Sequence, residues 1–232
     1  ATAVGTHVTL LGKVPSPKII MKAFEEVKPN LIITVPLVIE KIYKNVIQPI
    51  ISKKGMKWAL SIPLLDNQIY GQIRKKLIDA LGGRFKEIII GGAAMNPEVE
   101  EFFHKIKFPF TIGYGMTECS PVISTNLEWE NKKGSVGKLL PNCEAKVVDE
   151  EIWVRGSSVM QGYYKMPEQT AETLEDGWLK TGDLGYVDED DFVYITGRRK
   201  NLIILANGEN VSPEELENQL SRSALVKEIL VR

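Results

Sequence analysis

Apolar residues in the first part of the chain alternate between two spacings. Ile20, Phe24 and Val27 follow the period of a helix face, and the pair Ser16-Pro17 before them is typical of a helix start. The largely apolar stretch from Leu31 to Val35 predicts a short strand. The chain is therefore expected to begin with a helix followed by a strand.

Two further helices are predicted by the same helical spacing. Pro36 opens the first, and one of its faces is expected to carry Ile39, Ile42 or Tyr43, Val46 and Ile50. Asp66 is expected to cap the second, which Gly82-Gly83 closes and whose apolar face is expected to carry Ile69, Ile73, Leu77 and Leu81. The segment from Trp58 to Leu64 is ambiguous.

The next segments predict a parallel sheet. Phe85 to Ile90 and Phe108 to Ile112 have the composition of buried strands, and Asn96-Pro97 starts a helix between them that runs through Ile106. Strand, helix and strand in this order are typical of a parallel sheet covered by helices. Residues 1–126 are therefore expected to form part of a large α/β region.

The pattern changes after Asn126. Short β-branched segments separated by glycine predict a β-rich, antiparallel unit over residues 127–197, with strands at Gly134–Gly137, Ala145–Val148, Glu151–Arg155 and Val193–Thr196. Asp188–Asp191 is expected to be a hairpin turn, because its spacing does not fit a calcium loop. From residue 198 a hinge and the start of a small, mobile α+β domain are expected, with a helix from Ser212 to about Leu220 and a strand over Val226–Val231.

Composition and charge narrow the function classes only slightly. With 29 basic and 30 acidic residues the net charge is −1, so nothing favours a nucleic-acid partner. Cys119 and Cys143 have neither disulfide nor zinc-site spacing, which favours a reducing compartment. No apolar run approaches the roughly 20 residues that a membrane span needs. The absence of an initiator Met suggests a piece of a longer protein.

Two glycine turns follow predicted strands: Gly91-Gly92-Ala93-Ala94-Met95 and Gly113-Tyr114-Gly115-Met116-Thr117-Glu118. Ligands of open α/β sheets bind where strands end, and glycine lets the backbone approach them closely. Tyr114 could stack on a base, Thr117 could bind a phosphate and Glu118 could bind Mg²⁺. The alternatives are a tight turn after the first strand, and a strand-to-helix turn with a capping Thr after the second.

Two later residues are also candidates for nucleotide contacts. Asp183 follows a short strand and could accept hydrogen bonds from ribose hydroxyls, although an Asp in a turn often only satisfies nearby backbone N–H groups. Arg198 offers a rigid donor fork, with a solvated surface charge as its alternative. His7 and His104 share no motif, and no catalytic triad, P-loop or dinucleotide fingerprint is present.

Five segments in order resemble the adenylate-forming superfamily, which includes acyl-CoA synthetases, peptide-synthetase adenylation domains and luciferases. They are GGAAM, GYGMTE, EIWVRGSSVMQGYY, DGWLKTGDL and GRRKNLIILANGENVSPEELE, and together they cover about residues 86–220. The stretch from Pro29 to Val46 resembles the long-chain fatty acyl-CoA synthetase branch in particular.

The resemblance implies a role for each matching position. Gly91, Gly92 and Ala93 would line the adenine and acyl pocket. The Gly113–Met116 turn would bind the nucleotide, with Tyr114 stacked on adenine. Thr117 would bind phosphate and Glu118 would hold Mg²⁺. Asp183 and Arg198 would hold the ribose, Lys200 would be the hinge, and Gly208 would approach the pantetheine arm of coenzyme A.

The implied reaction is ATP-dependent. A fatty acid carboxylate attacks ATP to give acyl-AMP and pyrophosphate, and coenzyme A then displaces AMP, so the implied cofactors are ATP, Mg²⁺ and coenzyme A. The resemblance implies a cytoplasmic protein, with peripheral membrane contact left open because fatty acids partition into lipid. The acyl chain length and the oligomeric state are left open as well.

Three departures from the family pattern bear on activity. The family's phosphate loop and its C-terminal catalytic lysine are absent, and the join from Val148 to Glu151 is shorter than the family's turn. The chain is therefore expected to be a truncated fragment that is inactive or binds nucleotide weakly. An aryl- or medium-chain acyl-CoA ligase, a non-catalytic nucleotide- or acyl-binding module, and a structural domain without a ligand stay open as alternatives.

Overall fold

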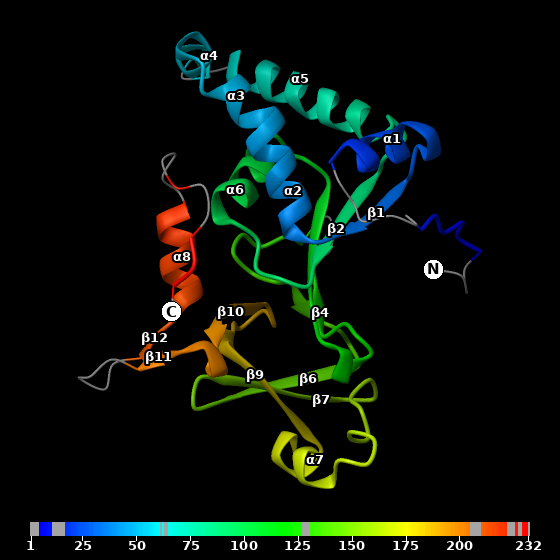
Figure 1. Cartoon of the computed structure of the whole chain (residues 1–232), viewed down its shortest axis with the longest axis vertical. Helices are drawn as coiled ribbons and strands as arrows, with labels where there is room; N and C mark the ends of the chain where they lie inside the picture. Colours follow the sequence, from blue (N-terminus) through cyan, green and yellow to red (C-terminus); the bar gives the residue numbers. More distant parts are fainter. Residues whose placement is uncertain are drawn as a thin grey trace. The chain divides into compact units, whose positions relative to one another are not determined.

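The computed structural model describes residues 5–10, 17–60, 62, 65–126, 130–204, 210–221, 226 and 229–231 (Figure 1). The chain divides into two compact units. The first comprises Ala1–Ile89 and Glu101–Phe110, and the second comprises Ile90–Glu100 and Thr111–Arg232. The domain limits expected at residues 126 and 197 stay a prediction.

Helices make up most of the first unit. Its elements in chain order are α1 (Pro17–Val27), β1 (Leu31–Thr34), α2 (Pro36–Ile42), the π-helical turn η2 (Tyr43–Ile47), α3 (Gln48–Ile51), α4 (Lys54–Ala59) and α5 (Leu65–Ala80). Three elements contribute residues to both units, namely β2 (Glu87–Gly91), α6 (Pro97–Lys105) and β3 (Phe110–Tyr114). The predicted helices and strands of this part of the chain are confirmed to within a few residues, and the ambiguous segment begins within α4.

The buried face of the second predicted helix differs from the expected one. Ile39, Tyr43 and Ile47 are buried, whereas Val46 is 48% exposed. The π-helical turn over Tyr43–Ile47 explains the change, because an i→i+5 turn adds a residue and moves the next apolar position toward the core. The Tyr43 ring packs edge-on against Phe102 with ring centroids 5.3 Å apart, so this shifted face contributes to the core of the first unit.

The α/β class is confirmed, but the first sheet is mixed rather than parallel throughout. Its strand order is β1-β2-β3-β4-β5, and β4 (Ser124–Thr125) pairs antiparallel with both β3 and β5 (Lys138–Leu139). The strand predicted at Gly134–Gly137 is wrong. Both glycines have positive φ, Gly134 lies in a turn, and the strand begins only at Lys138.

An antiparallel sheet dominates the second unit, as predicted. Its order is β10-β9-β7-β6, and the short strand β8 (Leu174–Glu175) also pairs with β9. The strands are β6 (Cys143–Val148), β7 (Glu151–Gly156), β9 (Trp178–Val187) and β10 (Val193–Arg198). Its core contains the buried side chains of Cys119, Ile123, Ile152, Val154, Leu179 and Val193.

The second unit also contains a helix that the sequence pattern does not predict, α7 (Pro167–Thr173). None of its residues is buried, so it has no apolar face that periodicity could reveal. The chain continues through the 3₁₀ turn η4 (Arg199–Asn201), β11 (Ile203–Ile204), β12 (Asn210–Val211) and α8 (Pro213–Ser221). The strand expected over Val226–Val231 is not found, since none of the residues that the structure describes there is in a strand.

Two tight connections shape the antiparallel sheet. Asp149 and Glu150, both with positive φ, close the β6–β7 hairpin as a two-residue turn. On one face of this sheet Lys146, Trp153 and Lys180 lie in register across three strands, and both ammonium groups stand about 5 Å from the Trp153 ring. These cations cover an indole ring that the core does not bury.

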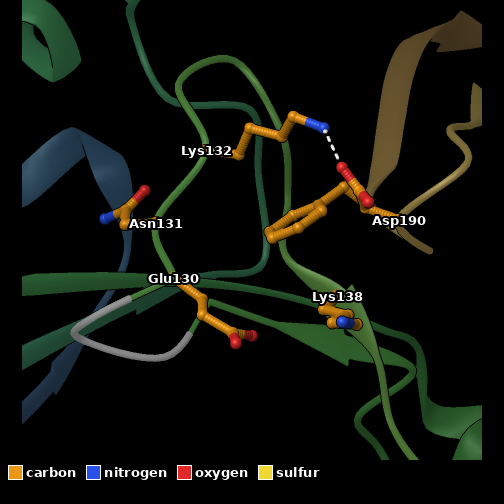
Figure 2. Close-up of a pocket in the computed structure, with 6 residues that line it drawn as sticks. Glu130, Asn131, Lys132, Lys138 and Asp190 are labelled. Atoms are coloured by element: carbon orange, nitrogen blue, oxygen red, sulfur yellow. Dashed lines mark hydrogen bonds and ion pairs between the residues drawn. The ribbon is translucent and has the colours of Figure 1, made fainter.

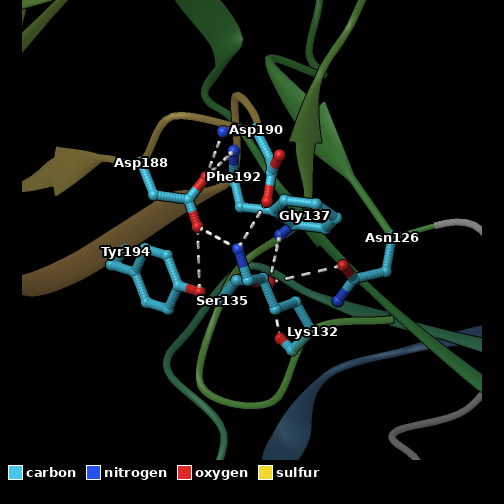
Figure 3. A network of polar contacts seen from close by, with 8 residues as sticks. All are labelled: Asn126, Lys132, Ser135, Gly137, Asp188, Asp190, Phe192 and Tyr194. Atoms are coloured by element: carbon cyan, nitrogen blue, oxygen red, sulfur yellow. Dashed lines mark hydrogen bonds and ion pairs between the residues drawn. The ribbon is translucent and has the colours of Figure 1, made fainter. Parts of the chain in front are cut away.

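The predicted hairpin turn at Asp188–Asp191 is confirmed, and a polar network fastens it (Figure 3). Asp188 accepts hydrogen bonds from the backbone N–H groups of Asp190 and Phe192, both at 3.0 Å, and from the Tyr194 hydroxyl. Lys132 forms ion pairs with Asp188 and Asp190. The network ties the loop before β5 to the turn between β9 and β10.

Candidate nucleotide-binding site

The two glycine segments predicted as turns begin within neighbouring strands, because Gly91 ends β2 and Gly113 lies in β3. A Cβ added at Gly91 would lie 3.0 Å from the carbonyl oxygen of Gly113, so the backbones are close at this point. Gly92 has a φ of +85°. A Cβ at Gly115 would lie 1.8 Å from the carbonyl oxygen of Pro121, a distance that no side chain tolerates. Glycine is therefore required at Gly115 by the fold, whatever the turn binds.

Tyr114, Asp183 and Arg198 form a connected cluster, although they lie on three different strands. The Tyr114 hydroxyl donates a hydrogen bond of 2.7 Å to Asp183 Oδ2. Arg198 Nε lies 3.0 Å from Asp183 Oδ1. Asp183 itself is buried, whereas the Arg198 side chain is 53% exposed. The structure thus brings together three of the residues that the sequence singled out.

Burial is the main influence on the ionisable groups of this cluster. Burial raises the pKa of Asp183, and the nearby Glu151 charge adds to the rise. The Tyr114 hydrogen bond and the Arg198 charge lower this pKa, but they do not cancel the rise. Burial also raises the pKa of Tyr114, and the Asp183 charge adds to that rise. Tyr114 is therefore a hydrogen-bond donor, and both Asp183 oxygens accept hydrogen bonds or an ion pair.

Thr117 and Glu118 begin the 3₁₀ turn η3 (Thr117–Cys119). Thr117 is exposed and Glu118 is half-buried. Glu118 Oε1 accepts a hydrogen bond of 2.9 Å from the Tyr163 hydroxyl, and its backbone carbonyl accepts one of 2.7 Å from the N–H of Met160. Tyr163 is a residue that the sequence analysis did not select.

The segment that carries Tyr163 is itself fastened. Thr170 Oγ1 accepts a hydrogen bond of 2.9 Å from the backbone N–H of Tyr163 and donates one of 2.8 Å to the Met166 carbonyl. Gly162, with φ +148°, packs so closely on Thr170 that an added Cβ would lie 2.8 Å from it. The Tyr163 hydroxyl is therefore held in place beside Glu118.

Glu151 is a second residue that the sequence analysis missed. Its buried carboxylate accepts a hydrogen bond of 2.7 Å from the backbone N–H of Gly182 and one of 3.3 Å from Trp153 Nε1, and Arg199 Nε lies 3.5 Å away. Gly182 directly precedes Asp183. The only signal for Glu151 in the sequence was its place at the start of the EIWVRG segment.

The remaining predicted site residues are spread more widely. Ala93 is exposed, and Met116 packs against the core of the second unit. Lys200 is exposed in η4. Gly208 lies outside the described residues. The structure does not show Thr117, Glu118 or Lys200 in contact with Asp183.

A pocket of about 360 Å³ lies elsewhere in the second unit (Figure 2). It is lined by Glu130, Asn131, Lys132, Lys138, Asp190 and Phe192. None of the predicted site residues lines it, and Lys132 in its wall is already paired with aspartates. Within the described residues, no group of three or more His, Cys, Asp or Glu side chains could hold a metal, and no helix is long and apolar enough to cross a membrane.

Comparison with known proteins shows the family. Residues 1–164 match the family model of AMP-binding enzymes, and the chain belongs to this family. A long-chain-fatty-acid–CoA ligase of Mycobacterium bovis is 33% identical over 229 residues, which cover 88% of this chain and 38% of that protein. A long-chain-fatty-acid–CoA ligase of Bacillus subtilis is 41% identical over 160 residues, covering 63% of this chain and 28% of that protein.

Solved structures agree with the family. O-succinylbenzoate coenzyme A synthetase from Bacillus subtilis in complex with ATP and magnesium has a TM-score of 0.67 and 27% identity, over 92% of this chain and 40% of that one. The same enzyme with an acyl-adenylate intermediate gives a TM-score of 0.68 at 27% identity, again over 92% and 40%. The chain thus spans well under half the length of the proteins that it resembles.

Proposed function

We propose that this chain carries the adenylate-binding part of an ATP-dependent acyl-CoA synthetase that acts on a long-chain fatty acid. The observation that supports it most directly is the cluster of Tyr114, Asp183 and Arg198. There the Tyr114 hydroxyl and the Arg198 guanidinium orient the buried Asp183 carboxylate. The chain belongs to the AMP-binding family, and a structure similar to it was solved with ATP and magnesium.

Each candidate residue has a role in this proposal. Asp183 accepts hydrogen bonds from the ribose hydroxyls and Arg198 assists it, while the Tyr114 ring stacks on adenine. The ends of β2 and β3 and the segments that follow them supply backbone close to the nucleotide, through Gly91, Gly92, Ala93, Gly113, Gly115 and Met116. Thr117 binds a phosphate oxygen, Lys200 is the hinge, and Gly208 approaches coenzyme A.

Glu118 fits a magnesium ion that is shared with substrate phosphates. Its Oε1 is bound to Tyr163, and its Oε2 makes no hydrogen bond or ion pair with the residues that the structure describes. Mg²⁺ commonly binds through one or two carboxylates together with phosphate oxygens and water, so one free carboxylate oxygen suffices. When bound, the ion would neutralise phosphate charge. The chain's own contribution is to hold Glu118 in a fixed orientation.

The chemistry follows the two half-reactions of the family. The carboxylate of the acid attacks the α-phosphate of ATP, giving acyl-AMP and pyrophosphate, and the thiol of coenzyme A then displaces AMP. The residues named above act mainly by position: they orient the ribose, the base and the phosphate so that the carboxylate meets the α-phosphorus in line. Because fatty acids partition into lipid, peripheral contact with a membrane surface is part of the proposal.

The long-chain substrate rests on the relatives' names. Ligases of two bacteria, and a peroxisomal long-chain acyl-CoA synthetase of Arabidopsis thaliana that is 34% identical over 239 residues, carry that description. The sequence from Pro29 to Val46, which resembles the same branch, supports the assignment. An aryl- or medium-chain ligase is the alternative within the family.

The first test is AMP binding to this chain, measured by calorimetry. Asp183→Asn removes the negative charge and one of the two acceptor oxygens proposed to bind the ribose. It should weaken AMP binding by about tenfold or more, since a charge-assisted hydrogen bond contributes about 1.5–3 kcal/mol. Asp176→Asn, in an exposed turn of the same unit, is the control and should leave the affinity unchanged. Equal affinities of the two variants would contradict the assignment of Asp183.

The second test is acid-dependent ATP–pyrophosphate exchange with fatty acids from acetate to stearate and with an aryl acid. It is run on this chain and on any longer protein that contains it. Exchange by the longer protein with long acids, and none by the chain alone, is expected because the chain lacks the family's phosphate loop. Exchange with aryl or medium-chain acids only would favour the alternative ligase. No exchange with any acid would favour a non-catalytic binding module.

A further inference from the structure

Two consecutive arginines pair with two buried carboxylates on neighbouring strands. Arg198 binds Asp183 of β9, with Nε 3.0 Å from Oδ1, and Arg199 binds Glu151 of β7, with Nε 3.5 Å from Oε2. Strands β7 and β9 are paired, and Glu151 lies opposite Leu184, the residue after Asp183. The end of β10 is therefore clamped at two points.

Glu151 is unusual because its carboxylate is buried at the beginning of a strand. Its side chain is 8% exposed, and a buried charge is tolerated only where hydrogen bonds and an opposite charge compensate it. Gly182 N–H, the Trp153 indole and Arg199 supply that compensation. One carboxylate thus contacts the strand that presents Asp183 and the side chain that precedes Lys200.

Arg199 is held from a second direction as well. One of its terminal nitrogens donates a hydrogen bond of 2.8 Å to the carbonyl oxygen of Asp149, in the turn between β6 and β7. Since η4 is a single turn of three residues, it has little helical hydrogen bonding of its own to fix it. The contacts of the Arg199 side chain therefore help to fix its position.

We propose that Glu151 is a positioning residue that fixes the start of the hinge. By holding Arg199 it keeps the backbone just before Lys200 against the sheet, and so keeps Arg198 on Asp183. Movement of the following residues then begins at Lys200 and leaves the ribose site assembled. The inference rests on the proposed function, because both the hinge and the ribose site belong to it.

Two substitutions separate this role from a purely structural one. Glu151→Gln keeps an oxygen that can accept from Gly182 N–H but removes the charge that holds Arg199. Arg199→Gln removes the same ion pair from its 47% exposed side, and therefore tests the idea even if the first variant does not fold. Glu144→Gln is the matched control, because it breaks the exposed ion pair with Arg155 on the same sheet.

The first measurement uses NMR of the whole chain without ligand. In Glu151→Gln and Arg199→Gln, the backbone amides of residues 198–200 should become mobile and the Trp153 indole N–H resonance should shift, whereas Glu144→Gln should change neither. Unaltered order at residues 198–200 in both test variants would overturn the inference. This outcome does not depend on whether the chain binds nucleotide.

The second measurement is AMP affinity. Glu151→Gln and Arg199→Gln should weaken AMP binding about three- to tenfold, and Arg199→Lys, which keeps the positive charge, should recover most of the loss. Test variants that bind AMP like the wild type would overturn the link to the ribose site. A wild-type chain that binds no AMP would refute the proposed nucleotide site, while the NMR result would still decide whether Glu151 fixes the hinge segment.

Discussion

The hydrogen bond from Tyr114 to Asp183 can be removed without creating a cavity. Tyr114→Phe deletes one hydroxyl and leaves the ring against the core of the second unit. The lost bond is short, at 2.7 Å, and its acceptor is a buried carboxylate. Hydrogen bonds to charged groups contribute about 1.5–3 kcal/mol, so the free energy of unfolding should fall by about 2 kcal/mol.

The loss should also depend on pH, with a defined sign. The pKa of Asp183 is already raised above its ordinary value of 3.8, so the folded chain loses stability as the pH rises through that pKa. The Tyr114 bond lowers this pKa, and removing the bond raises it further. The difference in the free energy of unfolding between the wild type and Tyr114→Phe should therefore be small below the ordinary Asp183 pKa of 3.8. It should reach its full size above the raised pKa of Asp183 in the variant.

Urea unfolding between about pH 4 and pH 8 measures both effects. Tyr186→Phe is the matched control, since the structure gives the Tyr186 hydroxyl no hydrogen bond to a described residue and the side chain is 51% exposed. It should change the unfolding free energy by less than about 0.5 kcal/mol. A loss for Tyr114→Phe as small as the control's, or one that shrinks as the pH rises, would refute the reasoning.

Three further outcomes are expected. Gly115→Ala should abolish folding or lower the melting temperature sharply, because its Cβ would meet the Pro121 carbonyl oxygen at 1.8 Å. Asp188→Asn should reduce the loss of stability on acidification, measured by urea unfolding. Lys132 lowers the pKa of Asp188, and the stability that a lowered carboxyl pKa provides is lost as the pH falls through that pKa. Tyr163→Phe should weaken Mg·ATP binding more than AMP binding in calorimetry. It removes the hydrogen bond that orients the Glu118 carboxylate, which is proposed to hold magnesium.

Each of these predictions has an outcome that contradicts it. A stable, normally folded Gly115→Ala chain would mean that the turn is wider than described. Unchanged acid sensitivity of Asp188→Asn would show that its hydrogen bonds, and not its charge, fasten the hairpin. An equal loss for Mg·ATP and AMP in Tyr163→Phe would make Tyr163 a general structural residue.

Local patterns predicted the elements where a strong apolar face or an unbroken apolar run was present. The helices α1 and α5 and the strands β1 to β3 appeared near their expected places because their apolar residues are periodic or clustered, although in β1 only Ile32 is buried. The helix α7 has no buried face, so no pattern could indicate it. The ordinary helical period predicts the buried face of the helix after Pro36 only in part, because the π-helical turn at Tyr43–Ile47 shifts that face by one residue.

The candidate site shows a similar division. Asp183 and Arg198 were selected from their segments, and the structure places them together with Tyr114. Tyr163 and Glu151 were missed because their importance lies in contacts with residues remote in sequence: the bond from Tyr163 to Glu118 spans 45 residues. Nothing in the spacing of a single sequence reports such a meeting of side chains. The roles of all these residues stay predictions.

The turn at Asp149 and Glu150 has a consequence for the order of folding. It joins β6 and β7 through two residues, so that hairpin can form with almost no loop-closure cost. The bond between Tyr114 and Asp183 instead closes a separation of 69 residues. Contacts between distant residues are slow to form, because the chain must lose much of its conformational entropy before these contacts stabilise it. The β6–β7 hairpin should therefore form early during refolding, and the candidate site should be completed later.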